Sequence, residues 1–237
     1  MEPGMVDLTP FRRYAEGTQP PFRDDAYVST HKRSPSLPPI EIPQTLSEVT
    51  GPRFDRALVA GYDDLTRFAG GVAIGERIVI SGRVLDEDDQ PIRNTLIELW
   101  QANAAGRYVH RLDTHDAPLD AHFKGEGRTL TDDAGRYRFL TIKPGAYPFR
   151  NHHNAWRPAH IHFSLFGNAY AQRLVTQMYF PGDPLLAFDP ILQAVPSEQA
   201  RDGLVAQFDW DTTTPEYALG FRFDIVLRGR DATYFEK

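Results

Sequence analysis

The stretch RIVISGRVLDEDDQPIRNTLIELW, residues 77–100, decides the fold class. Its first part, residues 77–85, is rich in the β-branched and apolar residues that favour a strand. The polar run 86–91 that follows ends in proline and is typical of a turn. Residues 95–100 are again rich in aliphatic, β-branched and aromatic residues, and on a strand they would point alternately to its two faces. The stretch therefore predicts two successive strands joined by a turn.

The same pattern recurs along the chain. A polar turn at 131–135 leads into a further strand candidate, and the remaining candidates follow at intervals, so that strands are predicted at 136–142, 160–166, 173–180 and 221–227. Helix signals are few: residues 57–68 are compatible with a helix, and Ser197 before Glu198 marks a helix start for 197–207. Many short strands with few, short helices predict an all-β fold with a β-sandwich core.

Residues 1–55 differ from the rest of the chain in composition. They are rich in proline and poor in the periodicity of strands or helices, as the run at 35–43 shows. We predict that residues 1–70 form a long, irregular N-terminal arm with a short helix that lies at a subunit interface, and that 71–237 form the β-sandwich domain. A flexible tail is the alternative for the arm.

The composition narrows the possible functions. Hydrophobic residues make up 41% of the chain and the formal net charge is −6, so we expect neither nucleic acid nor an anionic membrane as a partner. The chain has no cysteine, which excludes disulfides, thiolate metal sites and thiol nucleophiles. Neither a secretory signal nor an apolar run long enough to span a membrane is visible, and we expect a cytoplasmic protein.

The sequence His160-Ile161-His162 is the sharpest local feature. On a strand, residues two apart point to the same face, so the two imidazoles lie side by side and one metal ion can contact both. Two ordinary structural histidines are the alternative, and the motif alone does not decide between them. No other histidine is in an obvious register with this pair.

Tyr108 and Tyr147 both follow predicted strands, where binding loops gather. A free tyrosine has a pKa of about 10, and a trivalent cation would lower it enough to give a phenolate ligand. Most tyrosines at such positions are packing residues, and composition and spacing alone do not single out these two.

Three stretches carry a resemblance to a known family: IELWQANAAGRY at 97–108, TIKPGAYP at 141–148 and WRPAHIHF at 156–163. From about residue 71 to 230 the chain resembles the intradiol ring-cleavage dioxygenases, whose ligand order is Tyr, Tyr, His-x-His. The short gap between Tyr147 and His160 is similar to the protocatechuate branch of that family, and the helical N-terminal domain of the catechol branch is missing.

The resemblance implies an enzyme whose catalytic domain is residues 71–237. It would hold a non-heme Fe(III) through four side chains, namely Tyr108, Tyr147, His160 and His162. Tyr147 would also act as a base on the substrate, and Arg157 would stabilise negative charge on it.

Further residues match positions that contact the substrate or support the metal ligands in that family: Gln177, Tyr179, Ile191, Phe149 and Tyr27. The family usually has tryptophan where this chain has Phe149. The pocket wall is therefore smaller here and lacks an indole N–H donor.

The implied reaction is cleavage of protocatechuate (3,4-dihydroxybenzoate) by O2 between its two hydroxylated carbons. The product would be 3-carboxy-cis,cis-muconate, formed in aromatic degradation through the β-ketoadipate pathway. The resemblance also implies a homologous alpha subunit that forms αβ protomers, which assemble further. Two alternatives remain open: an intradiol enzyme for another substituted catechol, and a non-catalytic, transthyretin-like β-sandwich module.

Overall fold

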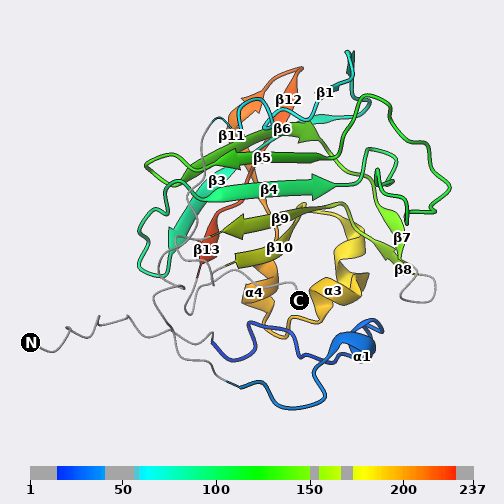
Figure 1. Ribbon diagram of the computed structural model, residues 1–237, viewed down its shortest axis with the longest axis vertical. Coiled ribbons are helices and arrows are strands. Elements are labelled where there is room, and N and C mark those ends of the chain that lie inside the picture. Colours follow the sequence, from blue (N-terminus) through cyan, green and yellow to red (C-terminus); the bar gives the residue numbers. More distant parts are fainter. Residues whose placement is uncertain (1–14, 41–56, 58, 150–154, 167–172, 228–237) are drawn as a thin grey trace, which may run out of the picture.

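The computed structural model describes residues 15–40, 57, 59–149, 155–166 and 173–227 (Figure 1). The predicted β-sandwich is confirmed, because the longer strands of the described chain form two sheets and the helices beside them are short. Within those residues, no helix is long and apolar enough to cross a membrane.

The first sheet has the strand order β10-β9-β4-β5 and is antiparallel throughout. Its strands are β10 (Arg173–Tyr179), β9 (His160–Phe166), β4 (Leu96–Gln101) and β5 (Glu126–Leu130). Strand β5 was not predicted, because the polar sequence Glu-Gly-Arg-Thr-Leu gives little strand signal.

The second sheet has the order β11-β12-β3-β13, and β6 also pairs with β3. Its strands are β11 (Gln207–Thr214), β12 (Ala218–Arg222), β3 (Arg77–Asp86), β13 (Ile225–Leu227) and β6 (Arg136–Ile142). The single strand predicted at 221–227 is wrong, since it is split into β12 and β13. At the break, the Asp224 side chain accepts a hydrogen bond from the Arg83 N–H at 2.9 Å, in place of a strand–strand bond.

The core lies between the inward faces of the two sheets. Alternate residues of each strand contribute to it, and its fully buried members include Ile78, Ile80, Ile97, Leu99, Phe139, Ile161, Phe163 and Leu165. Because side chains alternate along a strand, burying Ile161 and Phe163 directs His160 and His162 to the opposite face of β9.

Two small hairpins complete the strands. One pairs β1 (Arg67–Phe68) with β2 (Gly71–Val72), and the other pairs β7 (Tyr147–Phe149) with β8 (Ala155–Arg157). Residues 150–154, which include the histidines at 152 and 153, lie outside the described residues.

The helix predicted at 57–68 is wrong for residues 59–68, of which none is helical; Ala57 alone has a 3-10 helical conformation. Asp64 Oδ1 accepts hydrogen bonds from the Thr66 backbone and hydroxyl at 2.9 and 2.6 Å, which forms a local turn. The Leu65 N–H donates to the Leu140 carbonyl at 2.8 Å, so the segment is attached to β6 rather than coiled on itself.

The observed helices are α1 (Thr30–Arg33), the 3-10 helix η2 (Pro184–Phe188), α3 (Pro190–Gln193) and α4 (Glu198–Asp202). Ser197 caps α4, as predicted, by accepting a hydrogen bond from Ala200 N. The helix is shorter than the predicted 197–207, because β11 begins at Gln207.

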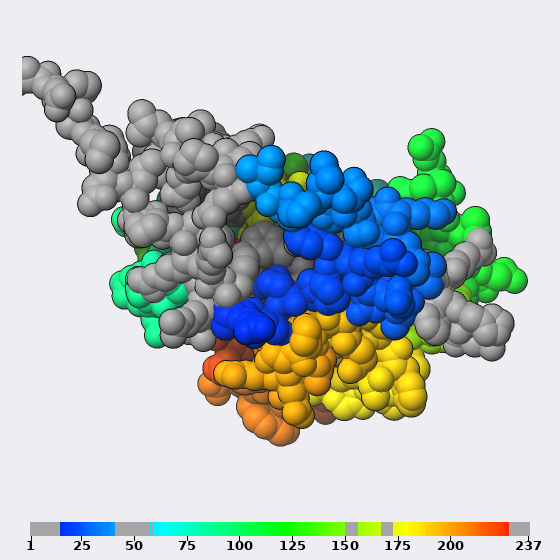
Figure 2. All heavy atoms as spheres, turned by 90° about the horizontal axis from the view of Figure 1, so that it is seen from below, coloured from blue at the N-terminus to red at the C-terminus, as the bar shows by residue number. Residues whose placement is uncertain are grey.

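The described part of the N-terminal arm, residues 15–40, lies along the body of the molecule. Figure 2 shows this segment, in blue, beside the elements coloured yellow and orange that include α3 and α4. The Ser197 N–H donates to the Gly17 carbonyl at 2.8 Å, which joins the arm to the start of α4. The four-residue helix α1 lies in this part of the arm and was not predicted, and the division of the chain at residue 70 stays a prediction.

Candidate metal centre

His160 and His162 lie at the beginning of β9, with ring centroids 4.9 Å apart. The antiparallel register places Tyr179 of β10 opposite His160, and Gln177 of β10 opposite His162. On the other side of β9, the indole of Trp100 is stacked on the His162 ring at 4.9 Å with an interplanar angle of 2°. The predicted side-by-side imidazoles are therefore present and held by both neighbouring strands.

Tyr108 and Tyr147 are brought together by close backbone packing of two loops. The Gly145 N–H donates to the Asn103 carbonyl at 2.9 Å. Gly106 has a φ of +78°, and a Cβ there would collide with the Ala146 carbonyl. Because the loops touch at these glycines, the two tyrosine rings meet edge to face at 5.4 Å.

The two tyrosines meet the two histidines in one cluster. The Tyr147 hydroxyl lies 3.2 Å from His160 Nε2, and the Tyr108 hydroxyl lies 3.2 Å from His162 Nε2. Four side chains from three separate parts of the sequence thus direct two phenol oxygens and two imidazole nitrogens toward one another.

The hydrogen bond of His160 Nδ1 determines which nitrogen of the ring carries the hydrogen. Nδ1 lies 2.7 Å from the Pro158 carbonyl, which can only accept, so Nδ1 carries the hydrogen and Nε2 carries the lone pair. Burial, with the nearby positive charge of Arg157, holds the pKa of His160 well below its usual value. The ring is therefore neutral, with Nε2 available as a metal ligand.

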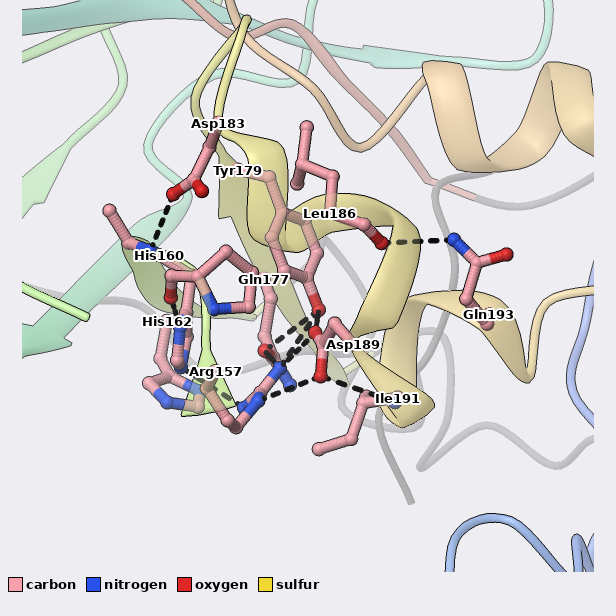
Figure 3. Close-up of polar contacts among 12 residues, drawn as sticks. Arg157, His160, His162, Gln177, Tyr179, Asp183, Leu186, Asp189, Ile191 and Gln193 are labelled. Atoms are coloured by element: carbon pink, nitrogen blue, oxygen red, sulfur yellow. Dashed lines mark hydrogen bonds and ion pairs between the residues drawn. The ribbon is translucent and has the colours of Figure 1, made fainter. Parts of the chain in front are cut away.

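A network of buried polar side chains surrounds Arg157 (Figure 3). Its Nε and Nη2 donate to the two carboxylate oxygens of Asp189 at 3.1 and 2.8 Å. Nη2 also lies 2.6 Å from Gln177 Oε1 and 2.9 Å from the Tyr179 hydroxyl, so its two hydrogens are shared among three acceptors, while Nη1 lies 3.1 Å from His160 Nε2. The arginine thus links β10 to the histidines of β9.

The ionisation of this network follows from its contacts. Burial alone would lower the pKa of Arg157, but the charges of Tyr179 and Asp189 outweigh it, and the pKa lies well above its usual value. Burial raises the pKa of Tyr147, an effect that the Arg157 charge opposes. A phenolate at Tyr147 therefore calls for more positive charge than the arginine supplies.

The other predicted pocket residues lie around this network. Phe149 of β7 has its ring 5.7 Å from the Arg157 guanidinium carbon and 6.1 Å from the buried ring of Tyr27 in the arm. Ile191 is buried on α3, next to the Asp189 cap of that helix. All the residues predicted for the site are within the described chain.

Two residues of the site were missed at the level of sequence. Trp100 lies in a recognised motif, but only the register of β4 against β9 shows that it covers His162. Asp189 precedes Pro190, a pattern typical of a helix start, yet nothing local indicates its contact with an arginine 32 positions earlier.

Carboxylates do not supply an alternative metal site in the part of the chain that the structure describes. There, no group of three or more His, Asp and Glu residues could hold a metal ion. Asp189, a carboxylate beside the cluster, is engaged with Arg157, and Asp113 accepts a hydrogen bond from the Tyr108 N–H at 2.8 Å. A metal at this centre would thus depend on the tyrosines.

Gly106→Ala is expected to break this centre by forcing the two loops apart. The variant is expected to bind less metal and to unfold at a lower denaturant concentration than Gly70→Ala, the matched control. Gly70 has nearly the same φ, +79°, but no atom within 4 Å of the added Cβ, so its cost is limited to about 1–2 kcal/mol of backbone strain. Equal stability and metal content in the two variants would contradict the proposed role of the contact.

Comparisons with known proteins agree with the fold and the cluster. A family model described as dioxygenase matches residues 49–229, and one for the N-terminal part of the protocatechuate 3,4-dioxygenase beta subunit matches residues 11–45. The fold and these matches define a β-sandwich dioxygenase, and the chain belongs to the intradiol ring-cleavage dioxygenase family.

Within that family, one relative is especially similar. The chain is 58% identical over 223 residues to the protocatechuate 3,4-dioxygenase beta chain of Burkholderia cepacia, which covers 93% of this chain and 94% of the relative. It is 32% identical to the alpha chain of the Pseudomonas putida enzyme, over 83% of this chain and 98% of the relative. Among solved structures, catechol 1,2-dioxygenase from Pseudomonas arvilla C-1 is 26% identical with a TM-score of 0.53, covering 78% of this chain and 62% of that one.

Proposed function

We propose that this chain is the iron-bearing subunit of an intradiol dioxygenase that cleaves protocatechuate with O2 to 3-carboxy-cis,cis-muconate. The observation that carries the proposal is the cluster in which the Tyr108 and Tyr147 hydroxyls lie 3.2 Å from the histidine Nε2 atoms. The 58% identity to a protocatechuate 3,4-dioxygenase beta chain supports this substrate.

The donor set fits a trivalent iron. Two phenolates and two neutral imidazoles would leave Fe(III) with one residual positive charge, and His160 is fixed in the tautomer that offers Nε2. The raised pKa of Tyr147 also agrees, because a buried phenolate is stable only beside an opposite charge. Tyr108, Tyr147, His160 and His162 would hold the ion, and the bound Fe(III) would supply Lewis-acid activation of the catechol.

The side chains of this site would bind, orient and deprotonate the substrate. The Tyr147 phenolate would accept a proton from a substrate hydroxyl. Arg157 would donate hydrogen bonds from Nη1 to a substrate oxygen and stabilise its negative charge. Phe149, Tyr27 and Ile191 would form apolar walls against the aromatic ring, which exclude water from it.

The chain is further proposed to act with a homologous alpha subunit. Its similarity to alpha chains of protocatechuate 3,4-dioxygenases, 32 and 30% identical, supports such a pairing of related chains. The arm reaches Phe149 through Tyr27, so a partner that contacts the arm would also border the site. A cytoplasmic location stays a prediction.

Turnover of a small panel of catechols by the co-expressed αβ protein tests the substrate. We expect O2 uptake to be fastest with protocatechuate and much slower with catechol and hydroxyquinol. A clear preference for catechol or hydroxyquinol would replace the substrate but keep the enzyme class. Absence of O2 uptake with every member would favour the non-catalytic β-sandwich module instead.

Tyr147→Phe is expected to lower kcat/KM by about 10²- to 10⁴-fold, the usual contribution of a general base. Iron should be largely retained, because phenylalanine keeps the ring contacts with Tyr108 and His160 and so leaves the other proposed ligands in place. Steady-state kinetics and iron analysis check this result. Tyr62→Phe, at an exposed tyrosine, is the control, and parental kinetics in Tyr147→Phe would contradict the assignment.

A further inference from the structure

Asp189 lies between η2 and α3 and is completely buried, at 0% exposure. Both carboxylate oxygens are fully engaged. Oδ1 accepts from Arg157 Nε at 3.1 Å and from the Ile191 N–H at 3.4 Å, while Oδ2 accepts from Arg157 Nη2 and from the Tyr179 hydroxyl, both at 2.8 Å (Figure 3). These contacts fix the position and rotation of the carboxylate.

The planar guanidinium of Arg157 is held on one edge by this carboxylate. A two-point contact of this kind sets the orientation of the whole group, since a guanidinium is rigid. Of its three nitrogens, Nη1 is the one that Asp189 does not contact, and it points to His160 Nε2 at 3.1 Å. The direction of Nη1 is thus determined by a carboxylate on the far side of the guanidinium.

The Nη1 contact uses the lone pair that a metal would take. Because His160 Nδ1 donates to Pro158, Nε2 has only one lone pair to offer, and a bound ion would occupy it. The Nη1 hydrogen would then be available to another acceptor at the same place, such as a substrate oxygen. Asp189 prevents the guanidinium from turning away when this contact is exchanged.

A second donor depends on the same network. Gln177 Oε1 accepts from Arg157 Nη2 at 2.6 Å and lies 3.2 Å from the Tyr179 hydroxyl oxygen, and the contact with the arginine fixes the orientation of the amide. Its Nε2 is buried and has no hydrogen-bond partner among the residues that the structure describes. Two N–H donors beside the histidines are therefore oriented by contacts that lead back to Asp189.

We propose that Asp189 is the positioning residue of the reaction, which directs Arg157 Nη1 toward the substrate and links it to Ile191 through the α3 cap. This inference rests on the proposed function for its reaction, but its geometric part concerns only side chains of this chain. Asp189 itself does not touch the substrate and acts through the arginine.

A double-mutant cycle on the co-expressed αβ protein tests the proposal, with Asp189→Asn, Arg157→Lys and both together. Asparagine keeps the shape and the cap acceptor but loses the charge and one acceptor. We expect Asp189→Asn to lower kcat by about 10- to 100-fold, as a donor displaced by about 1 Å would, with KM changed less than about 3-fold. When Arg157 is already replaced by lysine, Asp189→Asn should lower kcat by less than about 3-fold.

Three outcomes would overturn the proposal while the parent is active: an equal loss of kcat in both backgrounds, a loss that follows iron content, or a loss confined to KM. Asp132→Asn is the control, since this half-buried aspartate also accepts backbone hydrogen bonds, in a turn outside the site. If Asp189→Asn does not fold, Asp189→Glu takes its place, because it keeps the charge and displaces the carboxylate.

A crystal structure of metal-free Asp189→Asn gives a readout independent of turnover. We expect Nη1 to move beyond 3.5 Å from His160 Nε2, or the guanidinium to rotate out of its plane. An unchanged guanidinium would overturn the positioning role. A parent protein without iron or O2 uptake would instead contradict the proposed function, so the two failures are distinct.

Discussion

Replacing His162 with alanine is expected to reduce iron affinity at least about 100-fold, since even changes behind a ligand cost 10- to 100-fold. The imidazole is one of four proposed donors, and its Nε2 lies 3.2 Å from the Tyr108 hydroxyl. Alanine has no atom that can bind the metal at this position. The residues opposite it on the neighbouring strands, Trp100 and Gln177, have no imidazole to take its place. Elemental analysis of the purified variant measures the loss, and turnover should fall with iron content.

The control is His110→Ala, which removes an exposed histidine from the loop that follows Tyr108. This variant should keep parental iron and activity. Parental iron content in His162→Ala would remove His162 from the proposed ligand set. An iron loss in both variants would point to general instability of the protein rather than to a ligand.

Arg157→Ala is expected to destabilise the fold by about 3–5 kcal/mol, because it leaves the carboxylate of Asp189 buried without a positive partner. The side chains of Arg157 and Asp189 are 2% and 0% exposed, so solvent cannot replace the lost contacts. Gln177 Oε1 and the Tyr179 hydroxyl lose a donor at the same time. Urea denaturation of the metal-free parent and variant measures the difference in the free energy of unfolding.

Arg222→Ala gives the matched control for this prediction. Arg222 Nε lies 3.8 Å from Asp224 Oδ2, and both side chains are largely exposed, so its loss should cost at most about 1 kcal/mol. An Arg157→Ala variant as stable as Arg222→Ala would contradict the view that the buried network holds this part of the fold together.

Much of the fold was predictable because burial on one face leaves a period of two in the sequence. Strands β3, β4, β6, β9 and β10 appear at or within a residue or two of their predicted places. The polar strand β5 could not be found, since its Gly127 lies against Leu65 and Tyr62 from an earlier segment rather than following a pattern of its own. The helix predicted at 57–68 failed for a similar reason, because contacts with β6 outweigh local propensity.

Part of the candidate site was also predictable from local sequence, and part was not. The side-by-side placement of His160 and His162 follows from strand geometry, since two residues share a face. The approach of Tyr108 to Tyr147 depends on backbone contact between distant loops at Gly106 and Gly145, which no local pattern encodes, and was expected only from the family resemblance.

Asp189 shows what sequence reasoning misses entirely. Its local signal, an aspartate before proline, is fully explained by the cap of α3. The contact with Arg157 arises only when η2 packs beside β8, where Asp189 also accepts a hydrogen bond from the Tyr179 hydroxyl of β10. The proposed positioning role therefore had to come from the three-dimensional arrangement.

Iron content together with the visible spectrum of the co-expressed αβ protein tests the central claim most directly. With Tyr108, Tyr147, His160 and His162 as ligands, we expect one iron for each copy of this chain and a burgundy colour from tyrosinate-to-Fe(III) charge transfer. Tyr108→Phe should weaken that absorption. A colourless protein without iron, or an iron protein whose spectrum is unchanged by Tyr108→Phe, would contradict the account.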